Sequence, residues 1–189
     1  MVDESRNITD PKALRALAHP LRWQLLEIVG REGSATATQC AQETGESVAN
    51  CSYHLNLLAR YAYVEKAEGG QGREKPWRLV STTQRFGGDH EADDDTRLAT
   101  QAASTAFLDY ELALIRDRTV RLHLESAEWQ EAVGFDNAND YLTADEVDEF
   151  RQTVRGLMDH FRERRADPAK RPEGARSVNL FFSTTVKPD

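Results

Sequence analysis

The order of helix starts and stops over the first sixty residues most constrains what this chain can fold into. Prolines and capping side chains that favour a helix start alternate with glycines that favour a helix end. Apolar residues recur at helical spacing between these boundaries. Thr36 and Gln39 form a capping box at one of the starts. The sequence predicts four helices, over residues 11–18, 20–32, 36–44 and 47–61.

The period of the apolar pattern changes from helical to two just after the fourth helix. Residues 63–66 and 76–80 each alternate as a strand does, and the glycine-rich segment 68–73 between them is typical of a flexible turn. Four helices followed by a hairpin, with the third helix short, is the order of a winged helix-turn-helix. We therefore expect a mainly α fold that begins with this domain.

The fourth helix has two contrasting faces. Cys51, Leu55 and Leu58 fall on one face and predict a buried stripe. The opposite face is small and polar, which suits close approach to base edges in a major groove. It carries Ala49, Ser52, Tyr53, Asn56 and Arg60. The start of the preceding helix can bind a phosphate through its N-terminus, and it carries Thr36, Thr38 and Gln39. Arg73 and Lys75 at the hairpin can support this contact with the DNA backbone.

Four segments carry a more specific signal: ALRALAHPLRWQLLEIV, TATQCAQETG, SVANCSYHLNLLARYAYVE and GREKPWRLV. Together they resemble an ArsR-type winged-helix repressor over about residues 9–80, most specifically in the S-x-x-x-x-S-x-H-L-x-x-L pattern that starts at Ser47. The resemblance implies a homodimeric DNA-binding regulator whose recognition positions fall on Val48, Ala49, Ser52 and Tyr53. The family usually places a glycine after this helix, where this chain has Ala62. If that backbone needs a positive φ, alanine costs about 1 kcal/mol.

Metal binding and catalysis are both disfavoured by the residue pattern. The metal-sensing relatives carry a Cys-Val-Cys pattern in the short helix, whereas this chain has Cys40 alone there. Cys51 and His54 share a face and Cys40 can lie nearby, but these positions are also expected in the core. We expect no metal, no cofactor and, without a nucleophile elbow or phosphate loop, no enzyme. A redox role for Cys40 and Cys51 stays open.

Charge is divided unevenly along the chain. The polar segment 81–96, with Gly87-Gly88 and an acidic run, predicts a linker between a DNA-binding domain at 1–86 and a second region at 87–189. The first part carries a net charge of +1 and the second −9, out of −8 in total. The acidic part should repel DNA from all but the intended face. The start of the chain does not resemble a signal peptide and no apolar run is long enough for a membrane span, so we expect a soluble cytoplasmic protein with no membrane partner.

Residues 96–124 predict one long helix with a thin apolar seam of period near 3.5. The seam consists of Leu98, Ala102, Thr105, Leu108, Leu112, Ile115, Thr119 and Leu122. A second copy of the chain is the expected partner, which makes a two-fold dimer. The alternative is packing against the helix predicted at 143–165, which starts with a Thr143–Glu146 capping box.

The rest of the second region is expected to be a small α-helical and β-strand part. Residues 177–186 predict a closing strand that can pair with residues 139–142. The aromatic residues are expected in a core or around a small-molecule effector; they are Trp129, Phe135, Tyr141, Phe150 and Phe161. The function predicted is a homodimeric regulator, more specifically a repressor, that binds an inverted repeat in double-stranded DNA. The alternative is a winged-helix module that binds another protein.

Overall fold

The computed structural model describes residues 6–68, 75–81, 84–86, 92–161, 163–164 and 167–187, with only the backbone described at 6, 7 and 84–86. The chain divides into two compact units, Met1–Arg116 and Asp117–Asp189. The packing of the first unit thus continues beyond residue 86, while the assignment of DNA binding and dimerisation to separate regions stays a prediction. None of the helices in the described ranges is long and apolar enough to cross a membrane.

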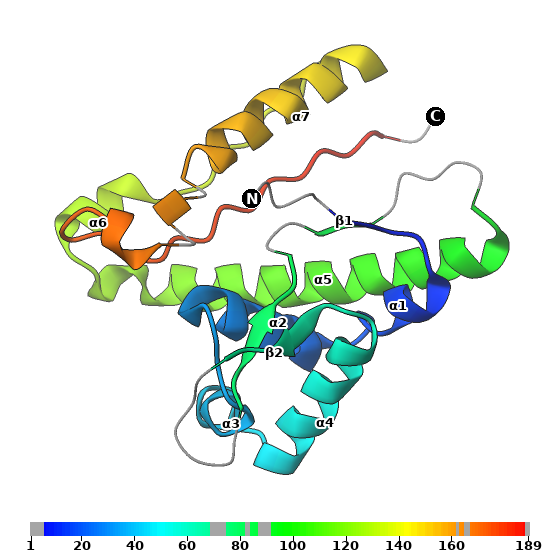
Figure 1. Cartoon of the computed structure of the whole chain (residues 1–189). Coiled ribbons are helices and arrows are strands. Elements are labelled where there is room, and N and C mark those ends of the chain that lie inside the picture. Colours follow the sequence, from blue (N-terminus) through cyan, green and yellow to red (C-terminus); the bar gives the residue numbers. More distant parts are fainter. Residues whose placement is uncertain are drawn as a thin grey trace. The chain divides into compact units, whose positions relative to one another are not determined.

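The first unit follows the predicted order of helices and hairpin (Figure 1). Its elements are β1 (Arg6–Ile8), α1 (Pro11–Arg15), α2 (Pro20–Glu32), α3 (Ala37–Thr44), α4 (Val48–Arg60), β2 (Val64–Lys66), β3 (Trp77–Leu79), β4 (Gln84–Phe86) and α5 (Asp94–Arg121). The predicted caps are confirmed, since Asp10, Thr36 and Ser47 each accept a backbone hydrogen bond at a helix start. The mainly α fold with a hairpin after α4 and a long helix is therefore confirmed.

A short parallel pair of strands was missing from the sequence prediction. Residues 84–86 lie in the predicted linker, but they form β4 and pair with β1, with Ile8 opposite Phe86. Ile8 is buried and belongs to the core of the unit. The predicted linker therefore contains a strand that the sequence did not indicate, because three-residue strands far apart in sequence carry too short an alternation to be detected.

The core of the first unit lies on both sides of α2, which runs between α5 and the α3–α4 pair (Figure 1). On the α5 side, the Trp23 and Phe107 rings lie 4.8 Å apart. The residues that α5 buries are small, namely Ala99, Ala103 and Ala106. Small side chains let helices approach closely, so this alanine face packs α5 against the core of the first unit.

The turn that follows α4 contains the one non-glycine residue with positive φ among the described residues, Ala62, at φ 55°. The Ala62 N–H donates to the Ala59 carbonyl and the Tyr63 N–H to the Leu58 carbonyl, both at 3.0 Å. These two bonds define a Schellman motif, in which the left-handed position usually belongs to glycine. The backbone demand anticipated at Ala62 is therefore present.

The second unit begins near the end of α5 and continues with η1 (Leu122–Leu124), α6 (Ala127–Ala132), α7 (Ala144–Asp159) and η2 (Pro168–Lys170). The Thr143–Glu146 capping box at the start of α7 is confirmed. Of the residues from 117 to 187 whose side chains are described, none is buried. This unit therefore has no core of its own comparable to that of the first unit.

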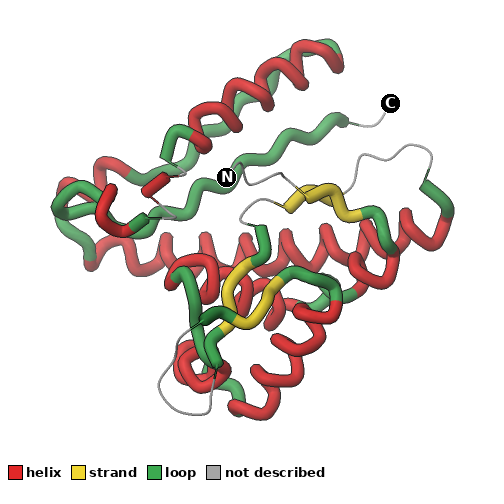
Figure 2. Tube along the Cα trace, viewed as in Figure 1, coloured by secondary structure: helices red, strands yellow, loops and turns green. Residues whose placement is uncertain are grey.

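The predicted strand at 177–186 and its pairing with 139–142 are wrong. Both segments, described throughout, are irregular (Figure 2). Side chains rather than a backbone ladder attach the later segment to α7: the Phe182 and Phe150 rings lie 5.8 Å apart and Arg151 Nη1 donates to Thr184 Oγ1 at 2.7 Å. The alternating apolar pattern at 177–186 thus does not produce a strand, because a strand also needs a neighbouring strand for backbone pairing and none pairs with this segment among the described residues.

Candidate nucleic-acid interface

The turn between α3 and α4 is fixed by local hydrogen bonds. Gly45 adopts the left-handed conformation, with φ 74°, that ends α3. The Ser47 hydroxyl accepts from the Asn50 N–H at 3.1 Å, and Glu46 accepts from the Asn50 side chain at 2.8 Å. Thr44 Oγ1 donates to the Cys40 carbonyl and lies 3.6 Å from Cys51 Sγ on α4. The start of α4 therefore has a defined direction relative to α3.

The outward face of α4 carries the residues predicted to contact DNA. Tyr53 is 63% exposed and Val48 45%. Ser47, Ala49, Asn56 and Arg60 are also exposed, and Ser52 is half-buried. The opposite stripe of Cys51, Leu55 and Leu58 is fully buried, as the sequence predicts.

Asn56 is oriented by its own helix. Its amide nitrogen donates to the Ser52 carbonyl at 2.7 Å and lies 3.4 Å from the Ser52 hydroxyl. Both contacts use the amide nitrogen of Asn56 and not its side-chain oxygen. Bidentate contact with adenine needs both the oxygen and the nitrogen. The nitrogen carries two hydrogens, so contact with adenine needs the oxygen and one of these hydrogens, whereas contact with the cytosine amino group needs the oxygen alone.

An Arg–His cluster that sequence reasoning missed supports α4 from beneath. Arg22 Nε donates to His54 Nδ1 at 3.1 Å, and Arg22 Nη1 donates to the Ala16 carbonyl at 2.8 Å. The His19 ring lies 4.7 Å from that of His54, and the Tyr53 ring meets His54 edge-on at 5.2 Å. Arg22 therefore joins α4 to the segment between α1 and α2, directly behind the exposed Tyr53.

The same cluster disfavours a charged His54. Burial lowers the pKa of His54 first, the positive charge of Arg22 and the nearby His19 lower it further, and Glu46 opposes them weakly. Burial also lowers the pKa of Arg22. Because His54 Nδ1 accepts from a guanidinium, the neutral ring fits this site and the doubly protonated ring does not.

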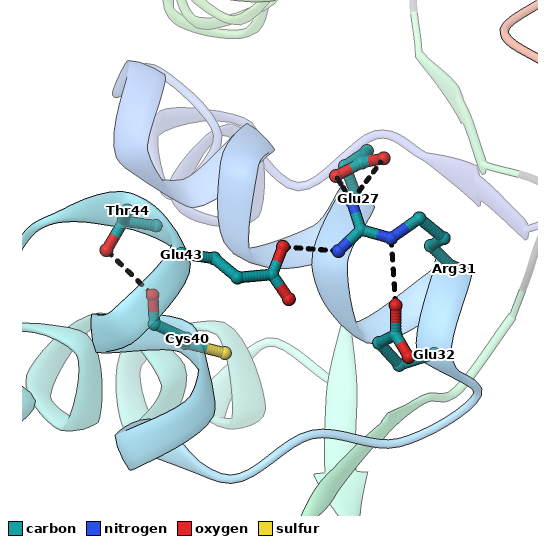
Figure 3. A network of polar contacts seen from close by, with 6 residues as sticks. All are labelled: Glu27, Arg31, Glu32, Cys40, Glu43 and Thr44. Carbon is teal, nitrogen blue, oxygen red and sulfur yellow. Dashed lines mark hydrogen bonds and ion pairs between the residues drawn. The ribbon is translucent and has the colours of Figure 1, made fainter. Parts of the chain in front are cut away.

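A second polar network holds α3 against α2 (Figure 3). Arg31 donates to Glu27 at 3.1 Å, to Glu32 at 2.9 Å and to Glu43 on α3. Partial burial lowers the pKa of Arg31, but the hydrogen bonds that Arg31 donates to Glu32 and Glu43, together with the charges of Glu27 and Glu43, outweigh the burial and raise the pKa. Arg31 therefore stays charged and connects α2 to α3 through Glu43.

The hairpin is anchored at its base. β2 pairs with β3 in antiparallel register, Val64 opposite Leu79, and a backbone bridge joins Ala35 to Trp77. The Lys66 ammonium lies 3.5 Å above the Trp77 ring. Lys75 is exposed at the end of the described part of the hairpin. Arg73, the other predicted contact here, lies outside the described residues.

The predicted contacts at the start of α3 are only partly accessible. Thr38 and Gln39 are exposed and Thr36 is half-buried. The capping box engages Thr36 and Gln39 with each other's backbone, at 3.2 and 2.8 Å. Thr36 and Gln39 are therefore engaged within the helix start that was predicted to bind a phosphate.

Both cysteines are fully buried and unbridged. With His54 Nδ1 facing Arg22, the predicted core role explains Cys51 and His54 without a metal. Across the described ranges, no group of three His, Cys, Asp or Glu residues could hold a metal ion.

The seam predicted for dimerisation lies on the outer side of α5. Leu98, Leu108 and Leu112 are 64%, 41% and 52% exposed. Ala102, Thr105 and Thr119 are exposed as well, and Ile115 and Leu122 are half-buried.

The aromatic residues of the second unit do not form a buried core, since Phe135, Tyr141, Phe150 and Phe161 are exposed and Trp129 is half-buried. Arg176 lies over the Trp129 ring and donates to both oxygens of Glu125, at 2.6 and 2.9 Å.

No known protein family matches the chain, and no curated protein is detectably similar to it.

Proposed function

We propose that this protein is a sequence-specific DNA-binding transcriptional regulator that acts as a homodimer, more specifically a repressor of the ArsR type. The observation that carries the proposal is the exposed polar face of α4, held on a rigid support by the Arg22–His54 contact and the buried Cys51–Leu58 stripe. A helix that is preceded by a short helix and followed by a hairpin is the element that enters the major groove in this class of domain.

The residues divide into two functional groups. Val48, Ala49, Ser52, Tyr53 and Asn56 face the base edges, and their small or polar side chains allow close approach. Arg60, Lys75 and the start of α3 meet phosphates, which sets the position of α4 without reading sequence. Because the whole chain carries a net charge of −8, affinity has to come from these focused contacts.

The apolar seam of α5 pairs two copies. A two-fold dimer presents two α4 helices to successive major grooves, about 34 Å apart, so its operator is an inverted repeat with half-sites one helical turn apart. Two half-sites also supply the contact area that one short helix lacks.

The test compares Tyr53→Ala with Arg60→Ala on a duplex selected by the full chain from a random pool, with Gln24→Ala as a control on an exposed position of α2. Fluorescence anisotropy gives the affinity for the selected and for a scrambled duplex. Tyr53→Ala should lower the ratio of the two affinities, by about 5- to 100-fold for one lost base contact. Arg60→Ala should weaken both equally and reduce the salt slope by about one. Equal effects of both variants on both duplexes would refute this division.

The alternative is a module that binds a protein through the same face. The acidic net charge and the exposed Tyr53 and Val48 are the observations that favour it. A selection that enriches no sequence, together with weak DNA binding that does not change with salt, would support this alternative and overturn the DNA-binding proposal.

A further inference from the structure

The first turn of α4 presents methyl groups on its outward side. At 100° per residue, Ala49 lies about half a turn from the centre of the buried Cys51–Leu58 stripe, close to the middle of the outward face. Ala49 is exposed, and the neighbouring Val48 is 45% exposed. The part of α4 that comes first along the chain therefore offers an apolar surface to whatever this face meets.

The backbone that carries Ala49 is held by contacts on either side of it. The Ser47 hydroxyl accepts from the Asn50 N–H at 3.1 Å, and the Asn50 amide nitrogen donates to Glu46 at 2.8 Å. Asn50 is half-buried and lies about 100° around the helix from Ala49. The Ala49 methyl group is therefore presented from a fixed position at the start of the helix, which lowers the cost of ordering it against a ligand.

The same end of α4 does not carry the side chains that read guanine best. Arg and Lys bind guanine in the major groove, whereas alanine contacts the 5-methyl group of thymine. Along α4, which is described over its whole length, the only Arg or Lys is the last residue, Arg60. At 1.5 Å per residue, Arg60 lies about 16 Å from Ala49 along the helix axis. The Ala49 end therefore suits an A·T pair, which presents the thymine methyl group in the major groove.

We propose that Ala49 reads a thymine in each half-site of the operator by contact with its 5-methyl group. The N-terminal residues of a recognition helix are those that meet base edges, and a side chain as small as alanine lets the helix approach closely. Val48 adds apolar area beside this contact, and Tyr53 meets a neighbouring base pair one turn further along α4. The inference rests on the DNA-binding proposal and adds the identity of one base and its reader.

Deoxyuridine isolates the contact, because it lacks only the methyl group of thymine and keeps the base pairing. In the duplex selected by the full chain, each thymine is replaced in turn, at the symmetric position of both half-sites, and fluorescence anisotropy gives the affinity. At one position the wild-type chain should bind about fourfold more weakly per half-site, or about fifteenfold for both, which is the effect of one buried methyl group. A selected duplex that is bound tightly but is insensitive to uracil at every position would overturn the inference and leave the DNA-binding proposal in place.

Variants at position 49 assign the methyl contact to a residue. Ala49→Gly lacks the side-chain methyl group, so its affinities for the thymine and the uracil duplex should agree within about twofold. Both affinities come from one protein, so a general loss of folding affects them equally and leaves their ratio unchanged. Ala49→Ser keeps a side chain at the helix start, places a hydroxyl against the methyl group and should also lower the ratio.

Gln24→Ala on α2 is the matched control and should keep the wild-type ratio. A wild-type ratio in both Ala49→Gly and Ala49→Ser would show that another residue contacts the methyl group and would overturn the inference. A full chain that enriches no sequence from the random pool would overturn the DNA-binding proposal together with it.

Discussion

Replacing Ala62 with glycine should stabilise the protein, although it removes a side-chain atom. Ala62 stands at φ 55° in the Schellman turn that joins α4 to β2, where a Cβ approaches the following carbonyl oxygen. The residue is exposed, so removing its methyl group sacrifices little buried area. Relief of backbone strain is therefore the main effect in the folded state.

The expected gain follows from two opposing contributions. A non-glycine residue in the left-handed region costs about 1–2 kcal/mol. Glycine also makes the unfolded chain more flexible, which lowers the free energy of unfolding by about 0.4–1 kcal/mol. The free energy of unfolding should therefore rise by about 0.5–1 kcal/mol, which corresponds to a rise in Tm of about 1–4 °C for a chain of this size.

Urea and thermal unfolding at a fixed protein concentration measure the change, because the proposed dimer would make Tm depend on concentration. The matched control is Ala113→Gly, which makes the same replacement at an exposed position inside α5 and should lower stability by about 0.5–1 kcal/mol. Opposite signs for the two variants are expected. A loss of stability in Ala62→Gly equal to that in the control would refute the strain at this turn.

Three other changes test polar contacts within the first unit. His54→Asn keeps an acceptor for Arg22 but removes the titrating ring. Because the pKa of His54 in the folded protein lies below its unfolded value, wild-type stability should fall as the pH drops below about 6.5, and urea titrations from pH 8 to 5 should show a smaller fall in the variant. Tyr63→Phe removes the buried 2.9 Å hydrogen bond to the Ala13 carbonyl and should cost about 1–2 kcal/mol, and an unchanged urea midpoint would contradict this. Arg31→Ala should cost about 1 kcal/mol in low salt and less in 1 M NaCl, and a salt-independent loss would show that packing dominates.

The local parts of this fold could be predicted because their causes are local. A capping box such as Thr36–Gln39 and a left-handed residue such as Gly45 each act within four residues, and the structure has both where the sequence places them. The positive φ at Ala62 could be anticipated only from the family resemblance, because the family usually places a glycine at this position.

The parts that the sequence did not reveal depend on distant contacts. Arg22 and His54 are 32 residues apart and meet only because α2 packs beneath α4. The β1–β4 pair joins two three-residue strands that no periodic pattern marks. At 177–186 an alternating pattern predicts a strand, yet strand formation also needs a partner, and Phe182 contacts α7 instead.

Hydroxyl-radical footprinting of the full chain on its selected duplex tests the central claim most directly, since it reports both groove contact and symmetry. The account predicts two equivalent protected stretches on one side of the DNA, centred about ten base pairs apart, and their loss in Tyr53→Ala at concentrations that saturate the wild-type complex. Uniform protection, or a footprint that Tyr53→Ala leaves unchanged, would contradict it.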